Sequence, residues 1–484
     1  MKLNNPELLR SQCLINGEWC DALSGKREAV INPATGAELA SIPLVSEEET
    51  QQAIAAAQRA QNDWKQLTAK QRSALLLAWA DKVLAAQEDL AQLMTAEQGK
   101  SLAEARGEVA YAASFITWFA EEAKRVDGAV LQAPQASQRL VVVKQPIGVC
   151  AAITPWNFPA AMITRKVAPA LAAGCAIIVK PAEQTPLTAL ALAKLAQDAG
   201  IPAGVLQVVT GEAAQVGKVL CDSPVVRKLS FTGSTEVGRI LMAQCAPSIK
   251  KLSLELGGNA PVIVFDDANL DAAVAGIMAS KFRNSGQTCV CANRIYVQDG
   301  IYERLAEKLV AAVEQLNVGD GSQEGTTQGP LIDSDAVAKV QSHIDDALIK
   351  GAQIATGGQP HALGGTFFQP TVVTGVTQKM RFAKEETFGP VAPLFRFHDE
   401  AEAIAMANDT EFGLAAYLFT QNAARQWRVP EALEYGMVGI NTGLISNEVA
   451  PFGGVKQSGL GREGSRYGIE EYLELKYLCI DVSC

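Results

Sequence analysis

The sequence predicts an α/β protein whose strands form parallel sheets. From residue 149 onward, short apolar strands alternate with helices at the spacing of βαβ units. Strands are expected at 149–153, 175–180, 205–209 and 228–231, and helices at 161–172, 187–199 and 234–245. A second alternating region runs from 261 to 450 and includes expected helices at 270–282 and 302–315. Because a chain of 484 residues is too long for a single core, its length favours about three domains.

The segment before residue 149 is predicted to be mainly helical. Residues 46–49 (SEEE) form a capping box, so a helix is expected from there to Trp64. Helical patterns continue over 69–124, with Gly99 and Gly107 as expected interruptions. The β-branched stretch 139–144 predicts a strand. At the other end of the chain, the tail at 468–480 is expected to form an extended arm.

Composition argues against several classes of protein. The net charge is −10 and no run of Lys or Arg is present, which argues against a nucleic-acid partner. No apolar run approaches the ~20 residues that cross a bilayer. The N-terminus lacks the pattern of a signal peptide, so a soluble, cytoplasmic protein with no membrane contact is expected. Ten cysteines without such a signal do not indicate a disulfide framework, and three isolated histidines predict no metal site.

Asn157 lies where an expected strand passes into a helix. Ligands bind at such positions in open α/β sheets, and this asparagine stands between Trp156 and Phe158. Its side-chain NH2 can donate a hydrogen bond to a developing oxyanion. A turn asparagine that satisfies local backbone groups is an equally good interpretation of the segment alone.

Two further motifs follow expected strands. Lys180 and Glu183 can hold the hydroxyls of a cofactor ribose, although an isolated pair of this kind is more often a solvated ion pair. Gly233 and Ser234 open a helix whose first amides can face a pyrophosphate. Without the G-x-G-x-x-G pattern or a P-loop lysine, this second motif is a weak signal by itself.

The strongest chemical signal is Cys289 in the loop 286–289 (GQTC), together with Glu255 in the segment 254–258 (LELGG). A lone cysteine is most often a buried structural thiol. Here a glycine and small polar neighbours favour a reactive one, because reactivity needs a polar setting that stabilises the thiolate. A carboxylate followed by two conformationally free glycines supplies a base. A nucleophile and a base indicate covalent catalysis.

Together these motifs resemble the aldehyde dehydrogenase superfamily over nearly the whole chain. Seven motifs in the order and spacing of that family make the resemblance very specific. They are 155–159 (PWNFP), 180–183 (KPAE), 231–234 (FTGS), 255–258 (ELGG), 286–289 (GQTC), 386–390 (ETFGP) and 451–454 (PFGG). The resemblance implies an aldehyde dehydrogenase-like α/β fold, with two Rossmann-type parallel-sheet domains plus an oligomerisation arm.

The resemblance also implies a reaction. Cys289 would attack the aldehyde carbon, and Asn157 with the backbone N–H of Cys289 would hold the oxyanion of the thiohemiacetal. After hydride transfer to the cofactor, Glu255 would activate the water that hydrolyses the thioester. Relatives that pass the acyl group to coenzyme A lack a base at this place, so Glu255 favours release of a free acid.

Several positions are implied to bind the cofactor. Glu386 and Phe388 would line the nicotinamide-ribose side, and Lys180 and Glu183 would face the adenosine ribose. The remaining implied contacts are Trp156, Asn157, Gly233, Ser234 and Leu256. NADP-dependent relatives tend to carry serine at the position of Glu183, whereas a carboxylate bonds the ribose hydroxyls and repels a 2′-phosphate. NAD is therefore expected to be preferred, with NADP possible.

Within the family, the local sequence is most similar to the succinate-semialdehyde dehydrogenases. Members of that branch hold the distal carboxylate of the substrate with two arginines and a serine, which correspond here to Arg165, Arg283 and Ser446. Guanidinium groups bind carboxylates bidentately, although each arginine considered singly can equally be a surface charge. The expected substrate is a small aldehyde with a distal carboxylate. Glutarate semialdehyde, one methylene longer, and a broader range of aldehydes are alternatives.

Cys291 stands one residue from a second cysteine. The pair Cys289 and Cys291 can form a strained disulfide that blocks catalysis under oxidation. A small packing residue beside the nucleophile is the simpler interpretation, because such short bridges need unusual backbone geometry.

The family pattern further implies the domain organisation. An NAD(P)-binding domain would comprise 1–125 and 148–258, and a catalytic domain 259–450. Residues 126–147 and 451–484 would form an oligomerisation arm and C-terminal tail, so a homo-oligomer, dimer or tetramer, is expected.

Two remote alternatives are a non-catalytic scaffold and a cofactor-independent thiol esterase. A scaffold predicts loss of Cys289, Glu255 or Asn157, and all three are present. An esterase would leave the implied cofactor residues without a purpose.

Overall fold

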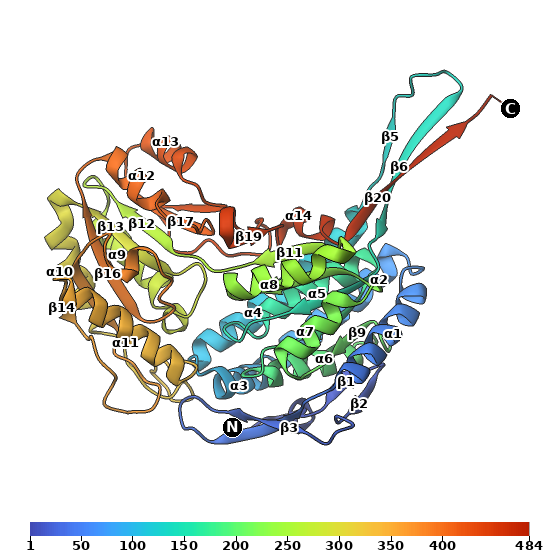
Figure 1. The fold of residues 1–484 in the computed structure, drawn as a ribbon, viewed down its shortest axis with the longest axis horizontal. Helices are drawn as coiled ribbons and strands as arrows, with labels where there is room; N and C mark the ends of the chain where they lie inside the picture. The colour runs from blue at the N-terminus through green and yellow to red at the C-terminus, as the bar shows by residue number, and fades with distance from the viewer. Residues whose placement is uncertain (484) are drawn as a thin grey trace.

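Two largely parallel sheets dominate the computed structural model, which describes residues 1–483 (Figure 1). The first sheet has eight strands in the order β19-β11-β10-β7-β8-β9-β1-β2. Its parallel strands are β7 (Val149–Ile153), β8 (Ala176–Lys180), β9 (Leu206–Val208), β10 (Val226–Thr232) and β11 (Lys251–Glu255). Antiparallel strands β1 (Cys13–Ile15), β2 (Glu18–Cys20) and β19 (Gly459–Leu460) complete its edges.

Helices enclose the first sheet, whose central strands are buried along their whole length. The preceding helices are α1 (Glu47–Trp64), α2 (Ala69–Ala85), α3 (Gln87–Gln98) and α4 (Leu102–Glu122). Between the strands run α5 (Ala161–Ala173), α6 (Pro186–Asp198), α7 (Ala213–Asp222) and α8 (Thr235–Cys245). Every residue of β7 and β8 is buried, as expected for a parallel sheet covered on both faces.

The second sheet has seven strands in the order β14-β15-β16-β13-β12-β17-β18. Its strands are β12 (Ala260–Val264), β13 (Ala292–Gln298), β14 (Gln353–Thr356), β15 (Thr371–Val376), β16 (Val391–Phe397), β17 (Ala415–Phe419) and β18 (Met437–Ile440). Its helices are α9 (Leu270–Lys281), α10 (Tyr302–Val313), α11 (Ser334–Ile349), α12 (Glu400–Asn408) and α13 (Arg425–Ala432). The predicted α/β class with parallel sheets is thus confirmed.

A buried arginine ties the second sheet to the segment that enters it. Arg294 on β13 is fully buried and donates to the carbonyl oxygens of Asn259 (2.9 Å) and Ala407 (2.9 Å). Because Asn259 follows the two glycines after Glu255, these bonds fix where the chain passes from the first sheet to the second.

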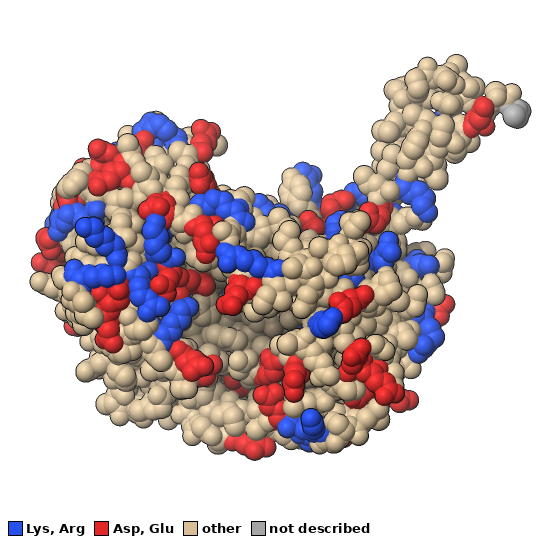
Figure 2. Space-filling model, viewed as in Figure 1, with Lys and Arg blue, Asp and Glu red and all other residues tan. Residues whose placement is uncertain are grey.

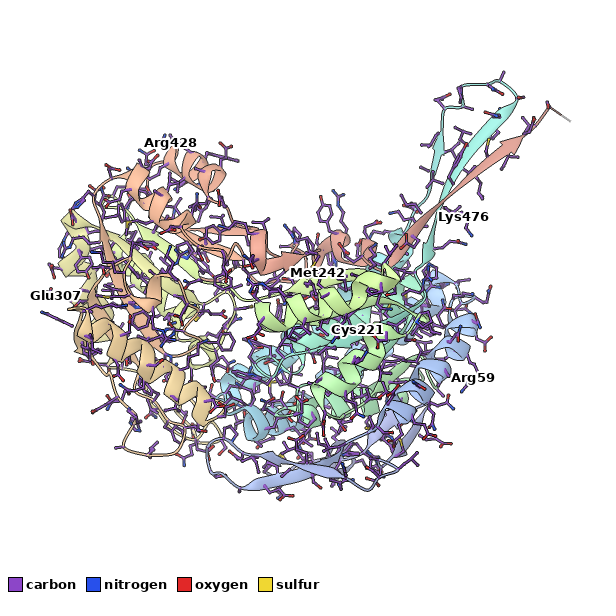
Figure 3. All side chains as sticks on the ribbon, in the orientation of Figure 1. Arg59, Cys221, Met242, Glu307, Arg428 and Lys476 are labelled. Carbon is purple, nitrogen blue, oxygen red and sulfur yellow. The ribbon has the colours of Figure 1, made fainter. Side chains whose placement is uncertain are left out.

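A three-stranded ribbon projects from the body of the molecule (Figure 1). It consists of β5 (Ala129–Leu131), β6 (Gln138–Pro146) and β20 (Leu473–Asp481), all antiparallel. Figure 3 shows its side chains, Lys476 among them, standing away from the rest of the protein. On the face drawn in Figure 2 most of its surface is neither acidic nor basic. A separate hairpin, β3 (Arg27–Ile31) with β4 (Glu38–Pro43), lies near the N-terminus.

Two expectations about local structure need correction. Gly107 does not interrupt a helix but lies inside α4, whereas Gly99 does end α3, with a φ of +96°. The tail is not extended throughout, because α14 (Ser465–Glu470) contains Gly468 and the strand begins only at Leu473. The sequence interpretation also missed α7, β11 and the edge strands of the first sheet. The domain boundaries stay a prediction.

Among residues 1–483, no helix has both the length and the apolar character that a membrane span requires.

Candidate active site

A cavity of about 340 Å³ lies between the two sheets, and Figure 2 shows the surface hollowed between the two halves of the molecule. Residues from both sheets and from α11 meet there. The wall includes Trp156, Asn157, Gly233, Ser234, Glu255, Leu256, Cys289, Asp333, Lys339, Glu386, Thr387 and Phe388. The cavity therefore brings together the predicted nucleophile, base and oxyanion donor, with six of the predicted cofactor contacts besides Asn157.

Cys289 is held by a sharply turned loop. Asn284, Ser285 and Gly286 all have positive φ, at +52°, +54° and +75°. At Gly286 a Cβ would stand 2.1 Å from the carbonyl oxygen of Gly389, so only glycine fits. At Gly258 a Cβ would stand 2.5 Å from the carbonyl oxygen of Cys289. The loop is thus packed against the glycines that follow Glu255, backbone against backbone.

Asn157 is buried beside this loop. Its Nδ2 donates to the carbonyl oxygen of Gln287 at 3.0 Å, which leaves the second N–H of that amide for another acceptor. Its own carbonyl oxygen accepts from Lys100 (2.8 Å) and from Asn284 (2.9 Å). These bonds fix the asparagine next to the cysteine loop.

The sequence interpretation missed the ion pair behind Asn157. Lys100 and Glu108 are both buried, and their charged atoms are 2.5 Å apart. Glu108 also accepts from the backbone N–H groups of Ala160 (2.9 Å) and Ala161 (3.2 Å), where α5 begins. The pair therefore positions the backbone of Asn157 through Lys100 and the start of α5 through Glu108. The signal available in the sequence was only a lysine and a glutamate eight positions apart, with nothing to indicate a shared partner.

Glu255 ends β11 and is buried. Neither carboxylate oxygen makes a hydrogen bond with any residue of the 1–483 range. Burial raises the pKa of Glu255 well above its ordinary value, and the nearby charge of Glu463 raises it further against the opposing effect of Arg165. A carboxyl group with a raised pKa and free oxygens can accept a proton near neutral pH.

The surroundings of Cys289 favour the protonated thiol. Burial and the neighbouring Glu386 raise its pKa to about 12, while Arg165 and Arg283 act in the opposite direction. This corrects the expectation of a setting that favours the thiolate. Glu386 itself has a pKa raised to about 7 by burial, and it accepts from the N–H of Gly258 at 3.2 Å.

The predicted cofactor residues fall into two groups. Trp156, Gly233, Ser234, Leu256, Glu386 and Phe388 line the cavity together with Asn157. Trp156 and Phe388 lie edge to face, with ring centroids 5.5 Å apart. Lys180 and Glu183 are not part of the cavity wall, and they form an ion pair with each other at the end of β8.

A second cavity of about 230 Å³ brings together two of the three predicted substrate residues. Arg283 and Ser446 line it with Lys100, Glu104, Gly107, Glu108, Tyr111, Phe158 and Asn284. Arg165 is not in the wall of this cavity. Its guanidinium is buried, with Nε 2.6 Å from Glu463 and Cζ 4.1 Å from the ring centroid of Phe452.

Cys291 turns its thiol toward the end of α9. Its Sγ is 3.1 Å from the carbonyl oxygen of Ser280 and 3.0 Å from that of Lys281. Both Cys289 and Cys291 are free thiols here. A disulfide between them stays a prediction.

This fold, with a cysteine, a buried carboxylate and an asparagine meeting between two parallel sheets, matches one family. Residues 19–478 match the aldehyde dehydrogenase family, and the chain belongs to that family. It is 65% identical over 480 residues to succinate-semialdehyde dehydrogenase [NADP(+)] of Escherichia coli (strain K12), covering 99% of this chain and 100% of that protein. It is 64% identical to glutarate-semialdehyde dehydrogenase of Pseudomonas putida over 482 residues, covering 100% of both. The crystal structure of succinate-semialdehyde dehydrogenase from Burkholderia pseudomallei superposes with a TM-score of 0.99 at 63% identity, covering 100% of both chains.

A buried histidine supports the cavity wall from α11. His343 is fully buried, and its Nδ1 lies 3.2 Å from the hydroxyl oxygen of Thr387, between Glu386 and Phe388. Burial lowers the pKa of His343 to about 4, and the charge of Arg381 lowers it further.

Acid should therefore weaken the fold through His343. The imidazole stays neutral in the folded protein down to about pH 4, but takes up a proton near pH 6.5 when unfolded. The contribution of neutral His343 to the free energy of unfolding is thus fully present above pH 6.5 and is lost as the pH falls. Between pH 7 and pH 5, chemical denaturation should show a loss of unfolding free energy about 2 kcal/mol larger in the unchanged protein than in His343→Gln. His398→Gln, at a largely exposed histidine, is the control; equal losses in all three proteins would contradict the assignment.

Proposed function

We propose that this NAD(P)-dependent aldehyde dehydrogenase oxidises succinate semialdehyde to succinate. The observation that carries the proposal is the second cavity, whose wall includes Arg283 and Ser446 together with Asn284 of the cysteine loop. Cationic and hydroxyl donors at that place suit an aldehyde that ends in a carboxylate. Relatives with nearly equal identity carry the names succinate- and glutarate-semialdehyde dehydrogenase, which supports a semialdehyde as the substrate class.

The cavity between the sheets fits a nicotinamide dinucleotide. Gly233 and Ser234 stand at the N-terminus of α8, where partial positive charge suits a pyrophosphate. Glu386 and Phe388 would border the nicotinamide ribose. When bound, the nicotinamide accepts the hydride that leaves the reacting carbon.

Cys289 provides the nucleophile in the proposed reaction. After loss of its proton, Sγ attacks the carbonyl carbon, and the carbonyl oxygen gains a negative charge. The free N–H of the Asn157 amide and the backbone N–H of Cys289 donate to that oxygen. The charge of Arg165 favours the thiolate and so assists the first step.

Glu255 acts in the second half of the reaction. Oxidation leaves an acyl group on Cys289 as a thioester, and a water molecule must lose a proton to attack it. The carboxylate of Glu255 faces the same cavity with both oxygens free to accept that proton. Its raised pKa suits a base that works near neutral pH.

Glu255→Gln should separate the two halves. The variant is expected to give a burst of reduced cofactor that matches the number of active sites, followed by steady-state turnover reduced by about 10²–10⁴-fold, because only thioester hydrolysis loses its base. Stopped-flow absorbance at the reduced-nicotinamide band measures both phases. Glu307→Gln, an exposed position on α10 (Figure 3), should match the unchanged protein. Unaltered steady-state turnover in Glu255→Gln would refute the role.

The distal carboxylate would be held mainly by Arg283. Replacing it with alanine should raise KM for succinate semialdehyde by about 100-fold, because a charge-assisted hydrogen bond is lost, and leave kcat/KM for butanal within about twofold. Parallel assays of succinate semialdehyde, glutarate semialdehyde and butanal test this. Arg304→Ala, at an exposed arginine on α10, controls for the loss of a positive charge. A uniform decline with all three aldehydes would remove the carboxylate site from the proposal.

Glutarate semialdehyde is the second candidate substrate. One methylene in a pocket changes binding by only about 1–3 kcal/mol, and a relative of that name is 64% identical to this chain. The ratio of kcat/KM for the two acidic aldehydes in the same assays decides between them.

Glu183 would set the preference for NAD over NADP. Its carboxylate pairs with Lys180 and would meet the 2′-phosphate of NADP with like charge. The Escherichia coli relative is named for NADP(+), so NADP is the alternative cofactor.

Glu183→Ser should shift the cofactor preference toward NADP. Removing the carboxylate leaves Lys180 free to attract the phosphate, so the NADP-to-NAD ratio of kcat/KM is expected to rise at least about tenfold. Initial rates at sub-saturating cofactor measure the ratio. Glu212→Ser makes the same change in net charge at an exposed position before α7 and should leave the ratio unaltered. An unchanged ratio in Glu183→Ser would exclude this residue as the determinant.

The projecting ribbon would serve self-association. Val130, Leu475 and Tyr477 on it are 77%, 69% and 57% exposed, and such an apolar surface suits strand addition between copies of the chain. The division into an NAD(P)-binding domain (1–125 and 148–258), a catalytic domain (259–450) and an arm with the tail belongs to the same proposal.

A further inference from the structure

A buried hydroxyl in the wall of the second cavity has no role in the reaction described so far. Tyr111 on α4 lines this cavity together with Arg283 and Ser446. Its Oη atom is buried and makes no hydrogen bond with any residue between 1 and 483. Buried hydroxyl groups in native proteins nearly always have a partner, so an unmet one at a cavity is available to an acceptor that enters there.

The surroundings of this hydroxyl are cationic. Among the charges that act on the Tyr111 hydroxyl, Arg165 and Arg283 have larger effects on its pKa than Glu463 and Glu448. The ring of Tyr111 meets that of Phe115 edge to face at 4.9 Å, and the guanidinium of Arg165 lies 5.2 Å from the Phe115 centroid. Burial raises the pKa of Tyr111, so the group remains a hydrogen-bond donor throughout the neutral range.

A second unmet donor lies near the first. Arg165 Nη2 is buried and also has no partner among the described residues. The hydroxyl of Tyr111 and the guanidinium of Arg283 lie in the wall of the cavity, and the charge of Arg165 acts from outside that wall. Donors and positive charge of this kind favour an acceptor that carries negative charge.

The acidic residues of the cavity do not supply that acceptor. Glu108 is engaged by Lys100 and by the first amides of α5. Glu104 accepts from the backbone N–H of Asn284 at 2.7 Å and from Ser101 at 2.9 Å. Neither carboxylate bonds the hydroxyl of Tyr111.

We propose that the hydroxyl of Tyr111 donates a hydrogen bond to the distal carboxylate of the aldehyde, which makes Tyr111 a specificity-determining residue. This assignment rests on the proposed function, because it needs a substrate whose carboxylate enters the second cavity. Tyr111 takes no part in the chemistry at Cys289. It raises the affinity for acidic aldehydes over neutral ones of the same length.

Tyr111→Phe tests the proposal, since it removes one oxygen atom and keeps the ring. KM for succinate semialdehyde should rise about tenfold or more, the effect of losing a hydrogen bond to a charged group, with kcat within about twofold. Butanal kinetics should not change, and competitive inhibition by succinate should weaken by a similar factor. Because the hydroxyl has no partner in the free protein, Tm should stay the same. Unchanged KM for succinate semialdehyde, or an equal loss with butanal, would overturn the proposal.

Tyr302→Phe is the matched control. Its hydroxyl donates to the carbonyl oxygen of Leu394 (3.1 Å) and accepts from the N–H of Gly375 (3.0 Å), so this variant should lower Tm without altering selectivity. The substrate preference of the unchanged protein separates the proposed function from the role of Tyr111. If that protein oxidises butanal as efficiently as the acidic aldehydes, the proposed function fails and the role of Tyr111 fails with it. If it prefers acidic aldehydes and Tyr111→Phe retains the full preference, only the role of Tyr111 is wrong.

Discussion

The candidate site depends on one buried ion pair, between Lys100 and Glu108. Charges at such a depth are costly unless all their hydrogen-bonding groups find partners. Here the partners are the carbonyl oxygen of Asn157 and the amides that begin α5, so the pair is stable only when the segment between β7 and α5 is in place. The position of Asn157 in turn depends on the ion pair. Without the pair, Asn157 would lose the bond that holds its backbone beside the cysteine loop.

Burial has a consistent effect on the reactive groups themselves. It raises the pKa of Cys289 and of Glu255, and so favours the protonated form of each side chain. A protonated thiol is a poor nucleophile and a protonated carboxyl is no base.

Local sequence patterns predicted much of this fold. Contacts between residues that are far apart in the chain could not be predicted from such patterns. Alternating apolar segments located β7, β8, β9 and β10 to within two residues, because each pattern is local. Glu108 and Asn157, or Arg165 and Glu463, are far apart in the chain, and no local pattern links them. Gly107 was taken for a helix break on propensity, but the buried face of α4 outweighs the cost of one glycine. Five of the seven motifs supply residues of the cavity wall, and three of these five lie at the ends of β7, β10 and β11. The motifs gave no sign that Arg165 is paired with Glu463 while Arg283 lines a cavity.

Gly107 also has an evolutionary consequence. It lines the second cavity, and a Cβ built there would meet no atom within 4 Å. A larger side chain would therefore fit and, under the proposed function, would shorten the space available to a substrate. Because glycine is poorly suited to a helix interior, the replacement would also stabilise α4 by about 0.5–1 kcal/mol. Adaptation to a smaller substrate at this position would carry a gain in stability instead of a penalty. Lineages could thus exchange one substrate for another on the face of α4 while Cys289, Glu255 and Asn157 are inherited unchanged.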